Sequence, residues 1–250
     1  MRLVLFTAAA ASALSLSGPA RADPRLDEKV YDPFVERRVG EIEVRQGSEF
    51  GGPLGGADTA VLEAEYGVSD RVSLALVGAM GRAPGGEERF GSLGLEGVAW
   101  LGQVPAIGVD TGIYLEYSRG FSGQSGGPEA KLLLAKTAGR FQGLANLILE
   151  RPLGVPRGEG YASYGYALSA TWRTKGAFRL GAEAFGDLGS DRAFGGRQGA
   201  YVGPQVKWAG RPKGLPFEIE LDAGWLAAVG TDSREGRTQA RLNLEFERKF

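Results

Sequence analysis

The sequence predicts an all-β protein, namely a closed antiparallel transmembrane β-barrel of about 12 strands with short periplasmic turns and longer external loops. Three observations favour this fold. Segments of about ten residues alternate apolar and polar side chains, as membrane strands do. The connections alternate between short and long, and the chain ends on an amphipathic strand that closes on Phe250. A soluble sheet is the alternative for any single segment, because amphipathic strands also occur there.

The N-terminus has the three parts of a secretory signal peptide. Arg2 supplies a positive charge, an apolar alanine-rich run follows, and residues 20–22 (Ala-Arg-Ala) form an A-x-A cleavage site. We therefore expect residues 1–22 to be removed during export. The polar residues 23–34 are expected to form a periplasmic N-terminal lead-in, and residues 35–250 the barrel.

Within the barrel, side chains at alternate positions of each segment are apolar, and those at the positions between them are polar. We call each set of alternate positions a parity. In the second segment, Leu62 and Ala64 alternate with Glu63 and Glu65. Successive side chains of a strand point to opposite faces, so such a segment has one face for lipid and one for the lumen. The segments predicted as strands are 35–47, 59–69, 72–81, 91–101, 107–118, 129–138, 140–150, 161–173, one from 178 to 187, one ending at 208, 217–226 and 237–250.

The connections between these segments sort by length. Tight turns follow the second, sixth and eighth segments, and short proline-containing turns follow the fourth and tenth. The other connections are mostly longer and rich in glycine and charge. Short periplasmic turns and long external loops are the outer-membrane pattern. The sorting places both chain ends in the periplasm.

The C-terminal strand carries the resemblance to a known class. Thr238, Leu242, Leu244 and Phe246 share its apolar parity, and Phe250 ends it. This ending resembles the last strand of bacterial outer-membrane β-barrels, in which a terminal aromatic residue is read by the barrel assembly machinery. Arg248 departs from that pattern, since the family usually has an apolar residue there.

At the level of pattern, residues 35–250 resemble small outer-membrane barrels of the transporter or porin type. Within that type, the chain is similar in size, signal peptide and strand count to the barrel family named for the MetA pathway of phenol degradation. The chain holds no diagnostic motif of that family. The resemblance implies localisation in the outer membrane of a Gram-negative bacterium and passage of small molecules.

Tyrosine and tryptophan residues predict the membrane interfaces. Their rings combine an apolar body with a polar tip, so they gather at the headgroup level. We expect an aromatic belt at the two ends of the barrel, formed by Tyr66, Trp172 and Trp208 at the periplasmic end and by Tyr117, Tyr164 and Tyr166 at the external end.

Composition excludes several functions. The chain contains no cysteine and no histidine, which removes thiol catalysis, the commonest general base and the commonest metal ligand. A formal net charge of −1 does not suggest a nucleic-acid partner. We therefore expect a protein that is not an enzyme, with no catalytic residue, metal site or cofactor.

The inward parity carries more acid than base. One interpretation is a water-filled lumen whose field favours cations, and the other is a packed interior of ion pairs without conduction. The corresponding functions are a channel for small solutes and a closed structural or surface-interaction barrel. The candidate lumen-lining residues are Glu41, Glu43, Glu63, Glu65, Glu96, Asp110, Glu116, Arg179, Glu183, Lys207, Glu218, Glu220, Asp222 and Arg241.

The predicted partners are outer-membrane lipid and the barrel assembly machinery. Arginines near the predicted external loops, such as Arg82 and Arg89, match the geometry of phosphate and are candidates for contact with lipopolysaccharide. A simply solvated rim explains the same residues. The pattern leaves the oligomeric state open.

Overall fold

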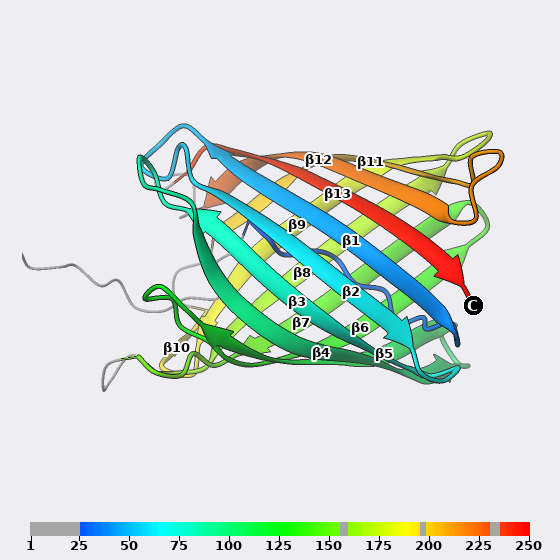
Figure 1. Cartoon of the computed structure of the whole chain (residues 1–250), viewed down its shortest axis with the longest axis horizontal. Coiled ribbons are helices and arrows are strands. Elements are labelled where there is room, and N and C mark those ends of the chain that lie inside the picture. The colour runs from blue at the N-terminus through cyan, green and yellow to red at the C-terminus, as the bar shows by residue number, and fades with distance from the viewer. Residues whose placement is uncertain (1–25, 156–159, 196–198, 231–235) are drawn as a thin grey trace, which may run out of the picture.

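The computed structural model describes residues 26–155, 160–195, 199–230 and 236–250. These residues form an all-β structure in which every strand pairs antiparallel with its neighbours (Figure 1). The predicted signal peptide, residues 1–22, lies outside the described residues. Among the described residues, no helix is long and apolar enough to span a membrane.

Twelve strands form the closed barrel, and the short β10 extends β9 as a hairpin beyond it. The bounds are β1 (Val39–Phe50), β2 (Asp58–Gly67), β3 (Val72–Arg82), β4 (Arg89–Val104), β5 (Val109–Gly120), β6 (Gly127–Ala138), β7 (Phe141–Glu150), β8 (Ser163–Arg173), β9 (Phe178–Ser190), β10 (Ala193–Phe194), β11 (Gly199–Gly210), β12 (Glu218–Gly230) and β13 (Thr238–Lys249).

Closure depends on the pairing of the first and last strands. Val39 lies opposite Lys249, and the ladder continues to Phe50 opposite Thr238. The predicted closed antiparallel barrel of about 12 strands is therefore confirmed. The first strand begins at Val39 rather than at residue 35, and the β9–β10 hairpin was not predicted.

The two ends of the barrel differ. At one end, which we call the turn end, β1 begins, β13 finishes and the strands are joined by short connections such as 68–71 and 139–140. At the other, the loop end, lie longer connections such as 151–162. Tyr66 and Trp172 lie at the turn end and Tyr117 at the loop end, with 43%, 54% and 60% of their surface exposed.

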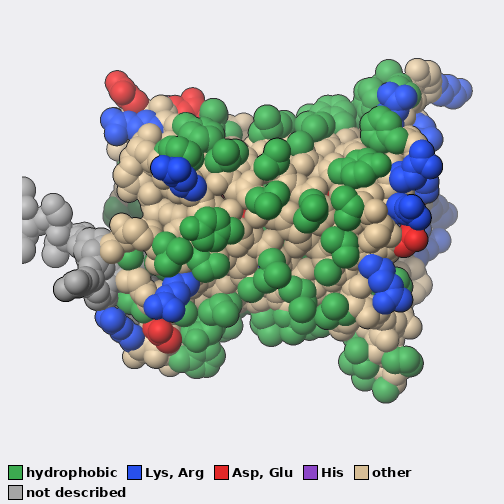
Figure 2. All heavy atoms as spheres, turned by 60° about the horizontal axis from the view of Figure 1, so that its bottom comes forward, with side chains coloured by type: hydrophobic (Ala, Val, Ile, Leu, Met, Phe, Trp, Pro, Cys, Tyr) green, Lys and Arg blue, Asp and Glu red, His purple; other side chains and the backbone are tan. Residues whose placement is uncertain are grey.

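Trp208 lies at the turn end, opposite Phe178, whereas Tyr164 and Tyr166 lie toward the loop end. Apolar side chains cover the middle of the face shown in Figure 2, and charged side chains gather at its two ends. The exposed apolar residues of the described strands include Leu76, Leu95 and Leu115. A band of this kind suits the hydrocarbon layer of a bilayer, where an exposed charge is costly.

Candidate functional site

The described residues that precede the first strand run inside the barrel. Leu26 lies against Gly47 in the loop-end half of β1, and the Arg38 backbone N–H donates to the Gly67 carbonyl at the turn end, at 2.8 Å. Figure 1 shows this segment as the dark blue trace within the strands. We call residues 26–38 the inner segment. The structure places residues 26–34 of the expected periplasmic lead-in inside the barrel, and residues 23–25 lie outside the described part.

Two glycines let the inner segment lie directly against the wall. A Cβ atom on Gly47 would overlap the backbone carbonyl of Leu26, and one on Gly67 would overlap that of Glu36. Any other residue at these positions would have to push the segment away. Some of the 41 glycines of the chain therefore serve close contact between the segment and the barrel.

Tyr31 is the apolar anchor of the inner segment. Its ring lies 4.7 Å from the ring of Tyr114 between centroids, in a buried cluster that also contains Val98 and Leu133. The fully buried Asn146 holds its backbone: the Tyr31 N–H donates to Asn146 Oδ1 at 2.8 Å, and Asn146 Nδ2 donates to the Tyr31 carbonyl at 2.8 Å. Both backbone groups of Tyr31 are thereby satisfied away from bulk water.

Lys29 is the charged anchor. Its Nζ atom lies 2.6 Å from Glu43 and 3.4 Å from Glu63, and Arg45 Nη1 contacts the same two carboxylates at 2.7 and 2.9 Å. Two carboxylates within ion-pair distance therefore compensate the charge of this largely buried ammonium.

A second ionic contact fixes the start of the inner segment. Lys131 Nζ lies 2.5 Å from the Glu28 carboxylate, and Arg241 Nη1 donates to the Glu28 backbone carbonyl at 2.5 Å. Lys131 also pairs with Glu129 at 3.0 Å. Because removing one partner of a buried ion pair leaves an uncompensated charge, these contacts hold the segment firmly once it is docked.

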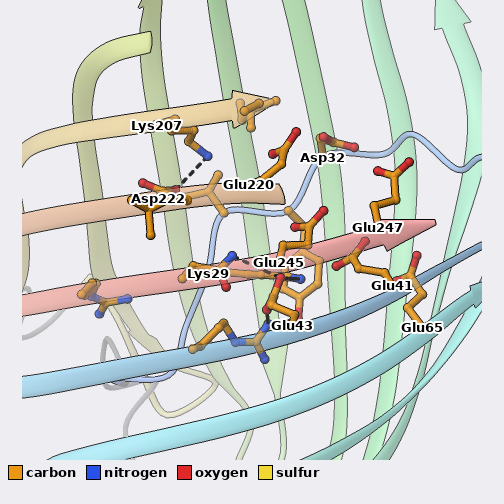
Figure 3. Close-up of a pocket in the computed structure, with 18 of the residues that line it drawn as sticks. Lys29, Asp32, Glu41, Glu43, Glu65, Lys207, Glu220, Asp222, Glu245 and Glu247 are labelled. Carbon is orange, nitrogen blue, oxygen red and sulfur yellow. Dashed lines mark hydrogen bonds and ion pairs between the residues drawn. The ribbon is translucent and has the colours of Figure 1, made fainter. Parts of the chain in front are cut away.

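Strand register arranges eight glutamates into two rows across β12, β13, β1 and β2. Figure 3 labels Glu41, Glu43, Glu65, Glu220, Glu245 and Glu247 of these rows. Neighbours within a row are directly opposite each other on adjacent strands. Like charges in that position repel, so each row is destabilising unless cations or protons compensate it. The deep row is Glu220, Glu245, Glu43 and Glu63, and the turn-end row is Glu218, Glu247, Glu41 and Glu65.

The described residues line a cavity toward each end of the lumen. The cavity at the turn end has a volume of about 640 Å³ and is lined by members of both rows together with Lys29 and Lys207. The cavity at the loop end has a volume of about 890 Å³ and is lined by residues such as Asp58 and Arg89. Leu26 and Asp27 of the inner segment border both cavities.

The structure brings most of the predicted lumen residues together. Nine of them line the turn-end cavity: Glu41, Glu43, Glu65, Arg179, Glu183, Lys207, Glu220, Asp222 and Arg241. Of the other five, Glu63 and Glu96 are almost fully buried. The remaining three make contacts elsewhere: Glu116 with the Tyr114 hydroxyl, Glu218 with Arg211, and Asp110 with Gln103.

Sequence reasoning missed the contribution of the inner segment and of two glutamates on β13. Glu245 and Glu247 have the polar parity of the last strand, but only the pairing of β13 with β1 and β12 shows that they complete the rows. The signal for the inner segment was weak, because alternating charges in a short polar stretch occur equally in exposed linkers.

No family model matches the chain, and no curated protein matches it. Among solved structures, the COG4313 outer membrane channel from Pseudomonas putida F1 superposes with a TM-score of 0.59 at 14% sequence identity, over 90% of this chain and 100% of that one. OprD from Pseudomonas aeruginosa gives a TM-score of 0.40 at 8% identity, over 76% of this chain and 60% of that one. The likeness to the COG4313 channel confirms the predicted resemblance to outer-membrane barrels at the level of fold.

Replacing Asn146 should loosen the inner segment. In Asn146→Val the two hydrogen bonds to Tyr31 are lost, and we expect docking to weaken by about 1–3 kcal/mol. Because the chain has no cysteine, Val30→Cys provides a single reporter thiol on the inner segment. Its labelling by a water-soluble maleimide should accelerate roughly tenfold or more in the Asn146→Val background.

Ser169→Ala is the matched control for that measurement. It removes a buried hydrogen bond to Gln205 on a part of the wall that Tyr31 does not touch. Its labelling rate should equal that of the parent. Equal rates in Asn146→Val and the parent would show that Asn146 does not anchor the segment.

Proposed function

We propose that this protein is a non-enzymatic outer-membrane channel for small solutes, with an acid-rich lumen that prefers cations. The observation that carries the proposal is a closed barrel with an apolar exterior and cavities of about 640 and 890 Å³ toward its two ends, of which the turn-end cavity is lined by many charged residues. The protein from Pseudomonas putida F1 with the same fold is itself described as an outer membrane channel. The apolar band embeds the barrel in outer-membrane lipid, and the turn end then faces the periplasm.

The preference for cations rests on the two glutamate rows. Glu41, Glu65, Glu245 and Glu247 line the turn-end cavity and make no ion pair with any residue in the described ranges. A ring of carboxylates in a narrow, partly desolvated passage attracts cations and repels anions. Lys29 and Arg45 partly neutralise the deep row, so the turn-end row contributes more of the negative electrostatic potential in the lumen.

The inner segment limits passage in the described arrangement. Tyr31 contacts wall residues from β4, β5, β6 and β7 and lines the turn-end cavity, and Leu26 and Asp27 border both cavities, so the segment occupies part of the lumen. A larger solute would therefore require the segment to move. Its contacts are therefore the control point of the channel.

Removing the inner segment should enlarge the conducting path. We expect a variant lacking residues 26–34 to show a single-channel conductance several-fold above that of the mature protein in planar bilayers, since the ion path widens over the length of the segment. Tyr31→Ala should give a smaller increase. Folded, inserted protein that fails to conduct with and without the segment would instead support a closed structural barrel.

Neutralising the turn-end row should weaken ion selectivity. In Glu41→Gln/Glu65→Gln we expect the cation-to-anion permeability ratio, read from the reversal potential in a salt gradient, to fall roughly twofold or more. Asp70→Asn, which removes an exposed charge from the turn 68–71, is the control and should leave the ratio unchanged. An unaltered ratio in the double variant would rule out the row as the selectivity determinant.

We propose Phe250 as the assembly signal. Its ring lies against Gly40 and its backbone N–H donates to the Arg38 carbonyl at 2.8 Å, so it ends the last strand beside the first. Phe250→Ala should lower the amount of folded barrel in outer membranes, measured by heat-modifiable gel migration, without changing refolding of the purified chain. A lipopolysaccharide contact by the external arginines stays a prediction from sequence.

A further inference from the structure

A compact group of carboxylates lies in the wall beside the inner segment. Glu63 and Glu65 of β2 and Glu96 of β4 each offer an oxygen, and these oxygens lie within 4.8 Å of one another. Ala75 of β3 is opposite Glu65 on one side and Glu96 on the other. Its small side chain leaves the space between the three carboxylates free of apolar bulk.

One buried oxygen at this group has no hydrogen-bond partner among the described residues. Glu96 is 2% exposed, and its Oε2 atom accepts from the Tyr114 hydroxyl at 2.8 Å, but its Oε1 atom has no partner. Ser73 is fully buried two positions from Ala75 on the same face, and its hydroxyl bonds to the Glu65 carboxylate. A buried carboxylate oxygen normally has a partner, so the lack of one at Glu96 indicates a missing ligand.

The carboxylates in this part of the wall also carry two more negative charges than the neighbouring cations balance. Arg45 and Lys29 pair with Glu43 and Glu63, so two cations balance two of the four carboxylates in this part of the wall. Glu65 and Glu96 make no ion pair within the described ranges. An uncompensated charge is costly at the buried Glu96 and less so at the partly exposed Glu65, and one divalent cation would balance both.

We propose that Glu63, Glu65 and Glu96 form a binding site for a divalent cation of the calcium type, with the Ser73 hydroxyl as a neighbouring oxygen donor. Calcium takes oxygen ligands at about 2.3–2.6 Å, so two oxygens on opposite sides of one ion lie roughly 5 Å apart. The separation within the group fits that distance. Magnesium, which demands a more regular octahedron at shorter distances, should bind more weakly.

The proposed site lies next to the inner segment. The Tyr31 hydroxyl lies 3.5 Å from Glu96 Oε2, and Lys29 reaches Glu63, so the ion would sit next to both anchors of the segment. Binding at this site does not depend on conduction and can be measured on the folded protein in detergent. The competing explanation for the missing charge is protonation of two of the carboxyl groups.

Terbium luminescence tests the proposal directly. Tb³⁺ replaces Ca²⁺ at oxygen sites, and the tyrosine rings of Tyr114 and Tyr31 are close enough to Glu96 to sensitise its emission. Purified mature protein should give saturable emission with one ion per barrel, and Ca²⁺ should displace it better than Mg²⁺. Glu65→Gln and Glu96→Gln should each weaken binding about tenfold or more.

Glu183→Gln is the matched control, because it removes another buried lumen carboxylate that lies outside the group and accepts from Gln205. Its terbium affinity should equal that of the parent. Folding of each variant is checked by heat-modifiable migration, and the partly exposed Glu65 provides a second test if Glu96→Gln does not fold. No saturable emission, or equal losses in all three variants, would overturn the proposal and favour protonation or a diffuse acidic field.

Discussion

Closure of the backbone hydrogen-bond ladder is the constraint on which the rest of this structure depends. In hydrocarbon no water can satisfy an exposed N–H or C=O group, so a sheet that spans a membrane must have no free edge. The pairing of β1 with β13 over the whole length of both strands meets that requirement. Once the ladder is closed, strand alternation fixes what faces lipid and what faces the lumen.

Alternation concentrates charge inside the barrel. Most charged residues in the middle of the described strands are turned inward, and the register of β12, β13, β1 and β2 then sets glutamates opposite one another. The inner segment compensates part of that repulsion, since Lys29 pairs with both Glu43 and Glu63. The segment and the acidic wall are therefore electrostatically complementary, and neither would be as favourable alone.

Parity could be predicted from the sequence, because it depends only on the spacing of residues within one segment. The inward positions of Glu43, Glu63 and Glu183 follow from it, as does the apolar exterior. Register could not be predicted, because it depends on how two strands that are distant in the sequence align with each other. The opposition of Glu43 and Glu245, separated by most of the chain, is a property of that register.

The path of the inner segment could not be predicted from the sequence either. Its local pattern is that of an exposed linker, and its position is determined by groups scattered over the barrel, such as Gly47, Gly67 and Asn146. A glycine in a strand indicates close approach of something, but the sequence does not say of what. Tertiary contacts with a segment outside the strand pattern are therefore the part of the site that only the structure supplies.

The barrel and its inner segment are stabilised by different interactions, and this separation permits movement. The strand ladder and the lipid-facing apolar band do not involve residues 26–35, so releasing these residues breaks no barrel hydrogen bond. The release costs the two hydrogen bonds of Asn146, the Tyr31 cluster and the ion pairs of Lys29 and Glu28. Water entering the lumen would solvate the freed charges and offset part of that cost. A rigid wall with a segment held by polar contacts can therefore change the width of its passage without unfolding.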